Sequence, residues 1–178
     1  KDCIKTALEK RAFDRAFRSS VADPDDFLAL LERLLTDRAL QRLSLAKKAG
    51  SVITGFTKVN SAIETAAVDV LVQASDASLD GKKRIAGKYK AICEELAIKP
   101  KTINLFSIEQ LSLAIGRPNV VHAALNHGRV ADEFILAARR LSSFLLLLDD
   151  ANPSANAAIG ATSPSESAND LGLETEQA

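Results

Sequence analysis

Two short loops carry the residue types best suited to contact with a nucleic acid. Residues 55–58 (Gly-Phe-Thr-Lys) place a flexible glycine, an aromatic ring, a hydroxyl and an ammonium group at the predicted start of a helix. Backbone N–H groups at such a start favour a phosphate, and an aromatic ring can stack on an unpaired base. Residues 115–119 (Ile-Gly-Arg-Pro-Asn) combine an apolar shoulder, a glycine for close approach and an arginine for a phosphate or a base edge. The sequence pattern alone favours an ordinary turn over a binding site in each stretch, and both interpretations stay open.

Residues that could support catalysis are few. His122 alternates within a predicted strand, which favours a packed or edge position, and His127 lies in an Asn-His-Gly turn that its neighbours explain. GxSxG, HExxH and phosphate-loop motifs do not occur. Cys3 and Cys93 are far apart without metal-binding spacing, and Cys93 falls on the apolar face of a predicted helix, as a small core residue does. We therefore predict no enzymatic activity, no catalytic or metal-binding residue, no cofactor and no small-molecule substrate.

The first loop lies inside a strand–turn–helix–strand unit. A β-branched run at 52–54 precedes the glycine turn, and an apolar run at 68–74 follows the helix. The short connections predict that these two strands pair in parallel through a right-handed crossover. The nearly continuous apolar character of 68–74 predicts a central strand covered on both faces.

The same alternation continues to residue 148. We expect a helix over 79–97, a strand over 102–106, a helix over 108–115 closed by Gly116, a strand over 120–125 and a helix over 128–148. The economical arrangement is an α/β fold, a three-layer α/β/α sandwich with a central sheet of about four strands, preceded by helices.

The first fifty residues are predicted to be helical. An amphipathic helix covers 2–18, and a break at 19–24 ends with Asp23 and Pro24 as start signals. Thr36 and Asp37 resemble a second cap, which would divide the next stretch into two helices. Lys47, Lys48 and Gly50 form a strong stop signal.

Charge and composition are uneven along the chain. Six of the 23 acidic residues fall in 149–178, which holds none of the 23 lysines and arginines, so residues 1–148 carry a surplus of six positive charges. A mildly basic body is compatible with a nucleic-acid partner, and the acidic, Ala- and Ser-rich tail is predicted to be disordered. Two cysteines without a disulfide framework fit a reducing compartment, so we expect a cytoplasmic protein. No apolar run reaches the roughly 20 residues of a membrane span, so we expect no membrane partner. The absence of methionine indicates a fragment of a longer protein.

Four segments, in this order and spacing, resemble a known family. They are LSLAKKAGSVITGFTKVNSAI, VDVLVQASDAS, LSLAIGR and PNVVHAAL. Together they resemble the kink-turn-binding ribosomal protein superfamily, the L-seven-Ae group with its bacterial YlxQ-type relatives. The stretch ALEKRAFDRAFR is similar to the last helix of a YlxR-type domain, and fusions of these two modules occur in alphaproteobacteria. The resemblance implies a truncated YlxR-like helix at 1–22, a linking helix at 23–36, an L-seven-Ae-like domain at 37–148 and the acidic tail at 149–178.

The resemblance also implies an RNA surface, with three departures from the family pattern. Thr57 stands where the family has Asn or Lys, Lys58 where it has Glu or Gln, and Ser61 where it has Lys. Lysine donates to guanine O6 and N7 or to phosphate but cannot accept from the guanine amino group. We therefore predict RNA binding without strict recognition of sheared G·A pairs. The predicted RNA-binding residues are Gly55, Phe56, Thr57, Lys58, Ser61, Asp76, Lys82, Lys83, Ile115, Gly116 and Arg117.

These observations predict a non-catalytic protein that binds structured RNA. The partner would be a kink-turn-like RNA, ribosomal RNA or the ribosome itself, and the role would lie in translation or ribosome biogenesis. A protein-interaction or regulatory adaptor on the same fold is the alternative, and an RNA-modifying enzyme is a weaker third. We also expect the acidic tail to compete weakly with RNA for the basic face.

Overall fold

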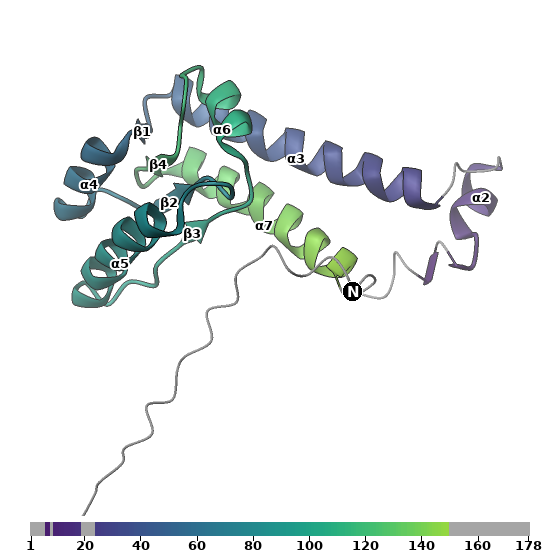
Figure 1. The fold of residues 1–178 in the computed structure, drawn as a ribbon. Helices are drawn as coiled ribbons and strands as arrows, with labels where there is room; N and C mark the ends of the chain where they lie inside the picture. Colours follow the sequence, from purple (N-terminus) through teal and green to yellow (C-terminus); the bar gives the residue numbers. More distant parts are fainter. Residues whose placement is uncertain (1–5, 8, 19–23, 150–178) are drawn as a thin grey trace, which may run out of the picture.

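The centre of the molecule is a four-stranded sheet with the order β1-β4-β2-β3. The computed structural model describes residues 6–7, 9–18 and 24–149 (Figure 1). The strands are β1 (Val52–Thr54), β2 (Val70–Gln73), β3 (Thr102–Ile103) and β4 (His122–Leu125). β4 is antiparallel to both of its neighbours, and β2 is parallel to β3. The order places β1 and β3 at the two edges of the sheet.

The predicted direct pairing of 52–54 with 68–74 is wrong. Both strands pair antiparallel with β4, so they point in the same direction with β4 between them. A central strand must bury its side chains on both faces, and all four residues of β4 are buried. The small Ala123 and Ala124 allow helices to approach both faces at this point.

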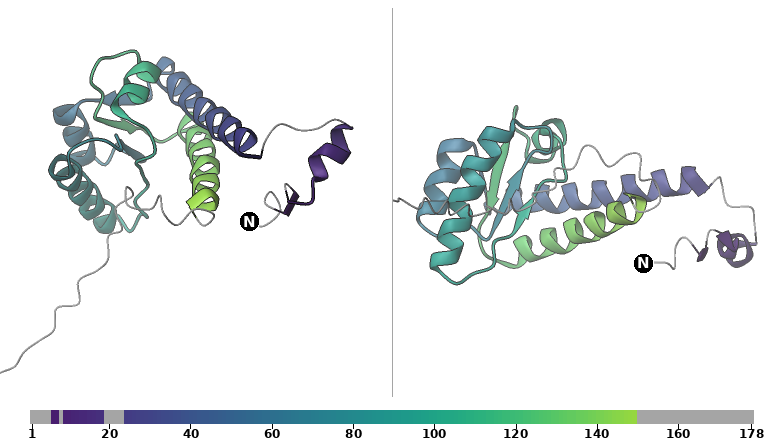
Figure 2. Two further views of the ribbon diagram at one scale, coloured as in Figure 1. Left: turned by 45° about the vertical axis from the view of Figure 1, so that its right-hand side comes forward. Right: turned by 60° about the horizontal axis from the view of Figure 1, so that its bottom comes forward.

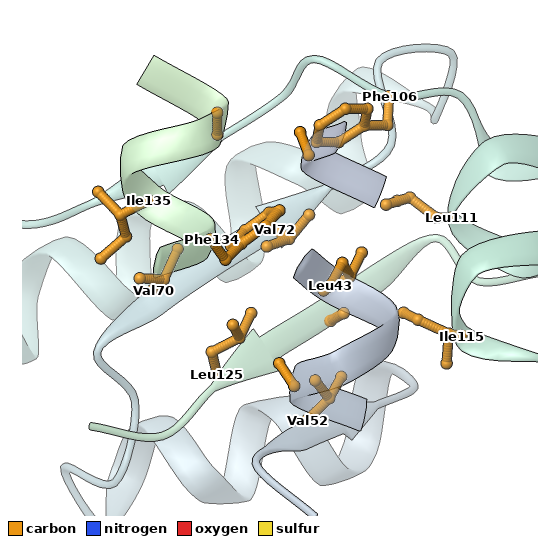
Figure 3. Packing of buried hydrophobic residues seen from close by; sticks show 14 of the residues in the cluster. Leu43, Val52, Val70, Val72, Phe106, Leu111, Ile115, Leu125, Phe134 and Ile135 are labelled. Atoms are coloured by element: carbon orange, nitrogen blue, oxygen red, sulfur yellow. The ribbon is translucent and has the colours of Figure 1, made fainter. Parts of the chain in front are cut away.

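Helices cover both faces of the sheet, as the predicted three-layer α/β/α sandwich requires. On one face, α4 (Phe56–Glu64) and α5 (Leu79–Glu95) pack on Leu71 and Ala124. On the other face, α3 (Pro24–Lys48), α6 (Ile108–Ile115) and α7 (Arg129–Asp149) pack on a larger cluster. Figure 3 shows this cluster, where Leu43 of α3 and Phe134 of α7 lie against Val72 and Leu125. Cys93 is buried in the smaller cluster, so the prediction of a core residue is confirmed.

α3 is one continuous helix, so the predicted cap at Thr36 and Asp37 is wrong. Leu35, Ala39 and Leu43 follow one another at four-residue spacing and pack into the main core across that position. This apolar stripe outweighs a side-chain cap, which contributes about 1 kcal/mol. The structure therefore shows no helix boundary between the expected linking helix and the expected RNA-binding domain.

The remaining elements follow the predicted order, several of them with shorter bounds. The helix predicted over 2–18 is interrupted at residues 10–11, where Arg11 is left-handed, and continues as α2 (Ala12–Phe17), whose Phe13 ring lies 5.2 Å from that of Phe27 on α3. Only two residues of the expected strand 102–106 join the sheet. α6 begins with a capping box between Ser107 and Gln110 and ends at Gly116 in the left-handed conformation, as predicted. Asp23 and the tail 150–178 lie outside the described residues.

α3 and α7 lie side by side and extend beyond the sheet (Figure 2). Arg42 of α3 bonds to Glu133 of α7 with an N–O distance of 2.7 Å. No helix in the described part of the chain is both long and apolar enough to cross a bilayer.

Candidate nucleic-acid interface

Most of the predicted RNA-binding residues gather at one end of the strands, where β1 and β2 finish and β4 begins. Because β4 runs antiparallel, its first residue, His122, meets the last residues of β1 and β2. The N–H of Gly55 donates to the His122 carbonyl at 3.1 Å, and Gln73 is the register partner of His122. The loop after β2 and the loop before β4 lie at the same end of the strands, joined by a bond from the Ala74 N–H to the Val121 carbonyl. The topology therefore brings together the Gly55 turn, the start of α5 and the Gly116 loop.

Gly55 has a backbone conformation that other residues rarely adopt. Its φ is 93° and its ψ is 146°, and no atom lies within 4 Å of where a Cβ would stand. The glycine starts α4 without a side-chain cap, so the first-turn N–H groups are left for solvent or a ligand. Thr57 and Lys58 are exposed in that turn, and Ser61 is exposed one turn beyond Thr57. The turn thus offers donors and one positive charge in one place.

We expect Gly55→Ala to destabilise the protein by about 2 kcal/mol, because an L-residue is strained at this φ and ψ. Thermal unfolding followed by circular dichroism measures the change. Gly87→Ala is the matched control, since Gly87 lies within α5 with open space around its Cβ position. That variant should be stabilised by about 0.5–1 kcal/mol through helix propensity. Equal shifts in both variants would contradict the assignment of strain to Gly55.

Phe56 is part of a three-member stack. Its ring meets the buried His122 imidazole edge-on at 6.0 Å, and the Arg84 guanidinium lies 5.4 Å from its centroid. The ring is 39% exposed, so it keeps a surface for a ligand. Arg84 was absent from the predicted site. Its place in the basic run at the start of α5 was a signal of charge, but only the fold shows that it contacts Phe56.

His122 and Gln73 form a buried polar layer beneath this stack. The Gln73 side chain donates to the Lys82 carbonyl at 3.0 Å, which attaches the first turn of α5 to the sheet. His122 is 6% exposed, so it is the packed histidine that the sequence predicts. Its Nδ1 is buried and has no hydrogen-bond partner among the described residues. Burial lowers the pKa of His122, so the neutral ring predominates near neutral pH.

The lowered pKa of His122 makes the stability of the folded protein depend on pH. The unfolded chain takes up a proton near pH 6.5, whereas folded His122 resists protonation until a lower pH. Stability should therefore be full above pH 6.5 and fall as the pH drops below it. We expect melting temperatures measured from pH 7.5 to 5 to fall less for His122→Gln than for the wild type. His127→Gln, at an exposed position, is the control and should leave the His122 contribution in place.

The loop after β2 is held by two of the predicted site residues. The Lys82 ammonium donates to the Ser75 carbonyl at 2.8 Å. An Asp76 carboxylate oxygen accepts the Ile108 N–H at 2.9 Å, at the start of α6. Both side chains are therefore engaged in positioning the loop. Lys83 is exposed and has no bonded partner within the described residues, so it supplies free charge beside Arg84.

The second loop differs from expectation at Ile115. This side chain is 4% exposed and belongs to the main core, so it cannot present an apolar shoulder to a base. The sequence held a signal for this, because Leu111 and Ile115 are four residues apart and share the buried face of α6. Leu113, on the other side of α6, is 84% exposed. Gly116 and Arg117 are exposed as expected, and Gly116 has a φ of 69°.

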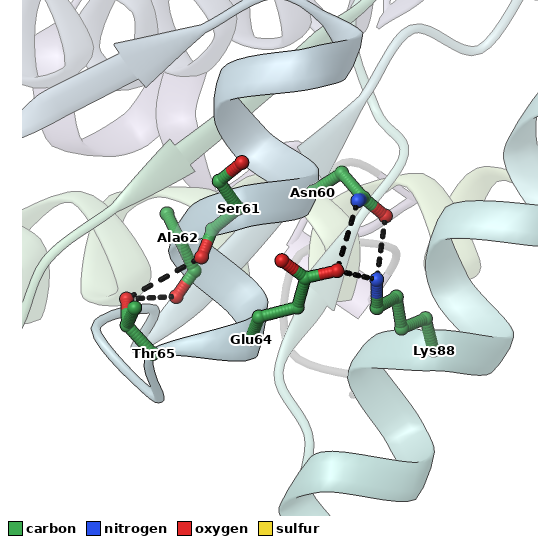
Figure 4. A network of polar contacts seen from close by, with 6 residues as sticks. All are labelled: Asn60, Ser61, Ala62, Glu64, Thr65 and Lys88. Atoms are coloured by element: carbon green, nitrogen blue, oxygen red, sulfur yellow. Dashed lines mark hydrogen bonds and ion pairs between the residues drawn. The ribbon is translucent and has the colours of Figure 1, made fainter.

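A polar cluster fixes α4 against α5 (Figure 4). The Lys88 ammonium bonds to the carboxylate of Glu64 and, at 3.1 Å, to the side-chain carbonyl of Asn60. The hydrogen bond from Lys88 lowers the pKa of Glu64. Since α4 carries Phe56 and α5 carries Arg84, this cluster helps to hold the stack together. Ser61 lies outside the cluster, with its hydroxyl directed away from it.

The described residues contain no group of His, Cys, Asp or Glu side chains that could hold a metal ion. This end of the sheet is instead a surface of backbone donors, one half-covered ring and several cations. Such a surface suits an extended anion with unpaired bases.

Comparisons with known proteins complete the description. No family model matches the sequence, and no curated protein matches it significantly. One similar solved structure is a Bacillus halodurans protein of unknown function, 24% identical, covering 61% of this chain and 96% of its own, with a TM-score of 0.44. Another is the Giardia lamblia 15.5kD RNA binding protein, 12% identical, covering 62% of this chain and 89% of its own, with a TM-score of 0.45. Both scores lie below 0.5, so the functional argument rests on the geometry of the interface.

Proposed function

We propose that this protein binds structured RNA without catalysing a reaction, through the end of the sheet that carries the Gly55 turn. The observation that carries the proposal is the junction at His122. At this end of the strands lie the uncapped start of α4, the Phe56–Arg84 pair and the loop that leads into β4. These groups supply phosphate donors, a stacking surface and positive charge, which are the components of RNA recognition outside a duplex.

In this proposal each group has its own contact. The first-turn N–H groups of α4, with Thr57 and Lys58, bind phosphate oxygens at the positive end of the helix dipole. An unpaired base packs on the exposed part of the Phe56 ring, whose electrons the Arg84 guanidinium polarises. Arg117 and Lys83 bind further phosphates on either side. Asp76 and Lys82 position the loop between them rather than contact RNA.

The sequence resemblance supports a narrower version of the proposal. On that basis the partner is ribosomal RNA, a kink-turn-like RNA or the ribosome, and the protein acts in the cytoplasm in translation or ribosome biogenesis. Lys58 is a donor where the family has an acceptor, so the recognition of phosphate and of guanine O6 and N7 replaces that of the guanine amino group.

A fluorescence-anisotropy titration tests the proposal with a kink-turn, a plain hairpin and a single strand. With about four phosphate contacts, affinity should fall roughly 20- to 50-fold between 50 and 150 mM salt. Preference for the kink-turn would support the narrower version. Equal binding to the kink-turn and the hairpin would support a general structured-RNA role. An affinity that does not change with salt concentration, or no binding to any of the three RNAs, would contradict the mechanism.

One observation favours an adaptor as the second candidate. Leu113 is 84% exposed and lines, with Leu40 and Gln110, a groove of about 210 Å³ between α3 and α6. An exposed apolar side chain beside a groove is a feature of protein-binding surfaces. If no RNA binds, a pull-down with the wild type and with Leu113→Asp would identify partners that depend on this groove.

A further inference from the structure

A second surface lies along the β3 edge of the sheet and takes no part in the proposed RNA interface. It is a groove of about 290 Å³ between residues 99–105 and α7. Its apolar lining includes Ile103, Ile135 and Ala138, and its polar lining includes Lys99, Arg139 and Ser142. A volume near 300 Å³ with an apolar floor and a polar rim is at the lower end of the range for binding pockets.

One wall of the groove is the unpaired side of β3. The Leu71 N–H donates to the Lys101 carbonyl, so in this parallel register the N–H and C=O of Thr102 point away from β2. No described residue bonds to either group. An open strand edge of this kind binds an added strand through main-chain hydrogen bonds.

The rim of the groove is positively charged. The Lys101 ammonium is bonded to Asp69 at 2.6 Å, whereas Lys99 and Arg139 have no carboxylate partner among the described residues. Two free cations therefore flank an apolar floor. A ligand that matches both must carry apolar side chains next to acidic ones.

The C-terminal segment of this chain has that composition. Residues 169–176 read Asn-Asp-Leu-Gly-Leu-Glu-Thr-Glu, and residues 150–178 hold five acids and no lysine or arginine. Leu171 and Leu173 are two residues apart, so in a strand both side chains lie on one face.

The segment is also tethered close to the groove. α7 lines the groove up to Ser142 and ends at Asp149, about 10 Å further along the helix at 1.5 Å per residue. The 19 residues from 150 to 168 span up to roughly 65 Å when extended, which allows the segment to return to the groove. Tethering on this scale gives an effective concentration on the order of millimolar, so a weak contact is sufficient.

We propose that residues 169–176 bind this groove by adding a strand to the outer edge of β3. Leu171 and Leu173 pack on the apolar floor, while Asp170, Glu174 and Glu176 lie beyond the short paired stretch and reach Lys99 and Arg139 at the rim from its two ends. Thr102 exchanges main-chain hydrogen bonds with the segment. The acidic tail is thereby directed to the β3 edge rather than to the RNA face, and the inference is independent of RNA binding.

Amide hydrogen exchange at Thr102 in the full chain tests the proposal in the absence of RNA. Since no described residue accepts from this N–H, its protection reports the added strand. We expect exchange at least about tenfold slower in the wild type than in Leu171→Asp/Leu173→Asp, in line with a millimolar local concentration. The matched control Ala157→Asp/Ala158→Asp adds the same charges outside the segment and should keep the protection.

A charge swap tests how much the ion pairs at the rim of the groove contribute to binding of the segment. Lys99→Glu/Arg139→Glu should lose the protection, and adding Asp170→Lys/Glu174→Lys should restore it. Equal exchange at Thr102 in the wild type and the leucine variant would overturn the proposal. Protection that increases with protein concentration would also overturn it, because the strand would then come from a second copy of the chain.

Discussion

Replacing Lys58 and Arg117 together by glutamate should lower the affinity for structured RNA by about 100-fold. Both side chains are exposed, Lys58 in the first turn of α4 and Arg117 in the loop between α6 and β4. A hydrogen bond to a charged group contributes about 1.5 kcal/mol, so the loss of two such bonds gives this factor before any repulsion. Anisotropy titrations measure the loss, and the salt dependence should become shallower by about two phosphate contacts. Unchanged circular dichroism and melting temperature would show that the fold is intact.

The matched control reverses two exposed charges on the parts of α3 and α7 that extend beyond the sheet (Figure 2). Arg33 is in the first half of α3 and Arg140 is in the second half of α7. Arg33→Glu/Arg140→Glu changes the net charge equally, and we expect only a few-fold loss through the overall field. Equal losses in both double variants would show that net charge, rather than this interface, controls binding. An affinity unaltered by Lys58→Glu/Arg117→Glu would favour the adaptor.

Removing the ammonium group in Lys101→Met should destabilise the protein by about 3 kcal/mol. Asp69 is 5% exposed, and its carboxylate accepts from Lys101 at 2.6 Å and lies 3.3 Å from Nδ1 of His127. Breaking a buried ion pair costs about 3–5 kcal/mol, and the lower end applies because a third of the Lys101 side chain is exposed. The melting temperature should fall by roughly 10 °C for a domain of this size.

Two further variants make this prediction specific. Asp69→Asn/Lys101→Met should recover most of the stability, because no buried charge is left without its partner. Lys99→Met removes a neighbouring exposed lysine with no described partner and should change stability by less than about 0.5 kcal/mol. A loss in Lys101→Met no larger than that in Lys99→Met would show that the pair with Asp69 contributes little.

Local signals in the sequence predict local structure well here. Ser107, Gln110 and Gly116 define α6 through its capping box and left-handed end, and the structure has that helix with the predicted bounds. Gly55 likewise marks the start of α4. These features depend on residues within one or two turns of each other, so the local sequence is enough to predict them.

Features that depend on distant contacts were not predicted. Nothing near residues 122–125 indicates that this strand inserts between β1 and β2, because the strand order is decided by packing across the whole sheet. The continuity of α3 across Thr36 depends on α6 and α7, which are distant in sequence. The same holds for the Phe56–Arg84 contact, which joins two helices through the sheet that supports both.

The position of β4 also determines the order in which the protein can be assembled during synthesis. β1 pairs with no described strand other than β4, and β4 is the last of the described strands to leave the ribosome. A nascent chain that ends before His122 can form the β2–β3 ladder but has no partner for β1. The Gly55 turn remains unsupported until then, since its N–H needs the His122 carbonyl. Contacts of such long sequence separation form slowly, so the RNA interface is completed only when nearly the whole domain has been translated.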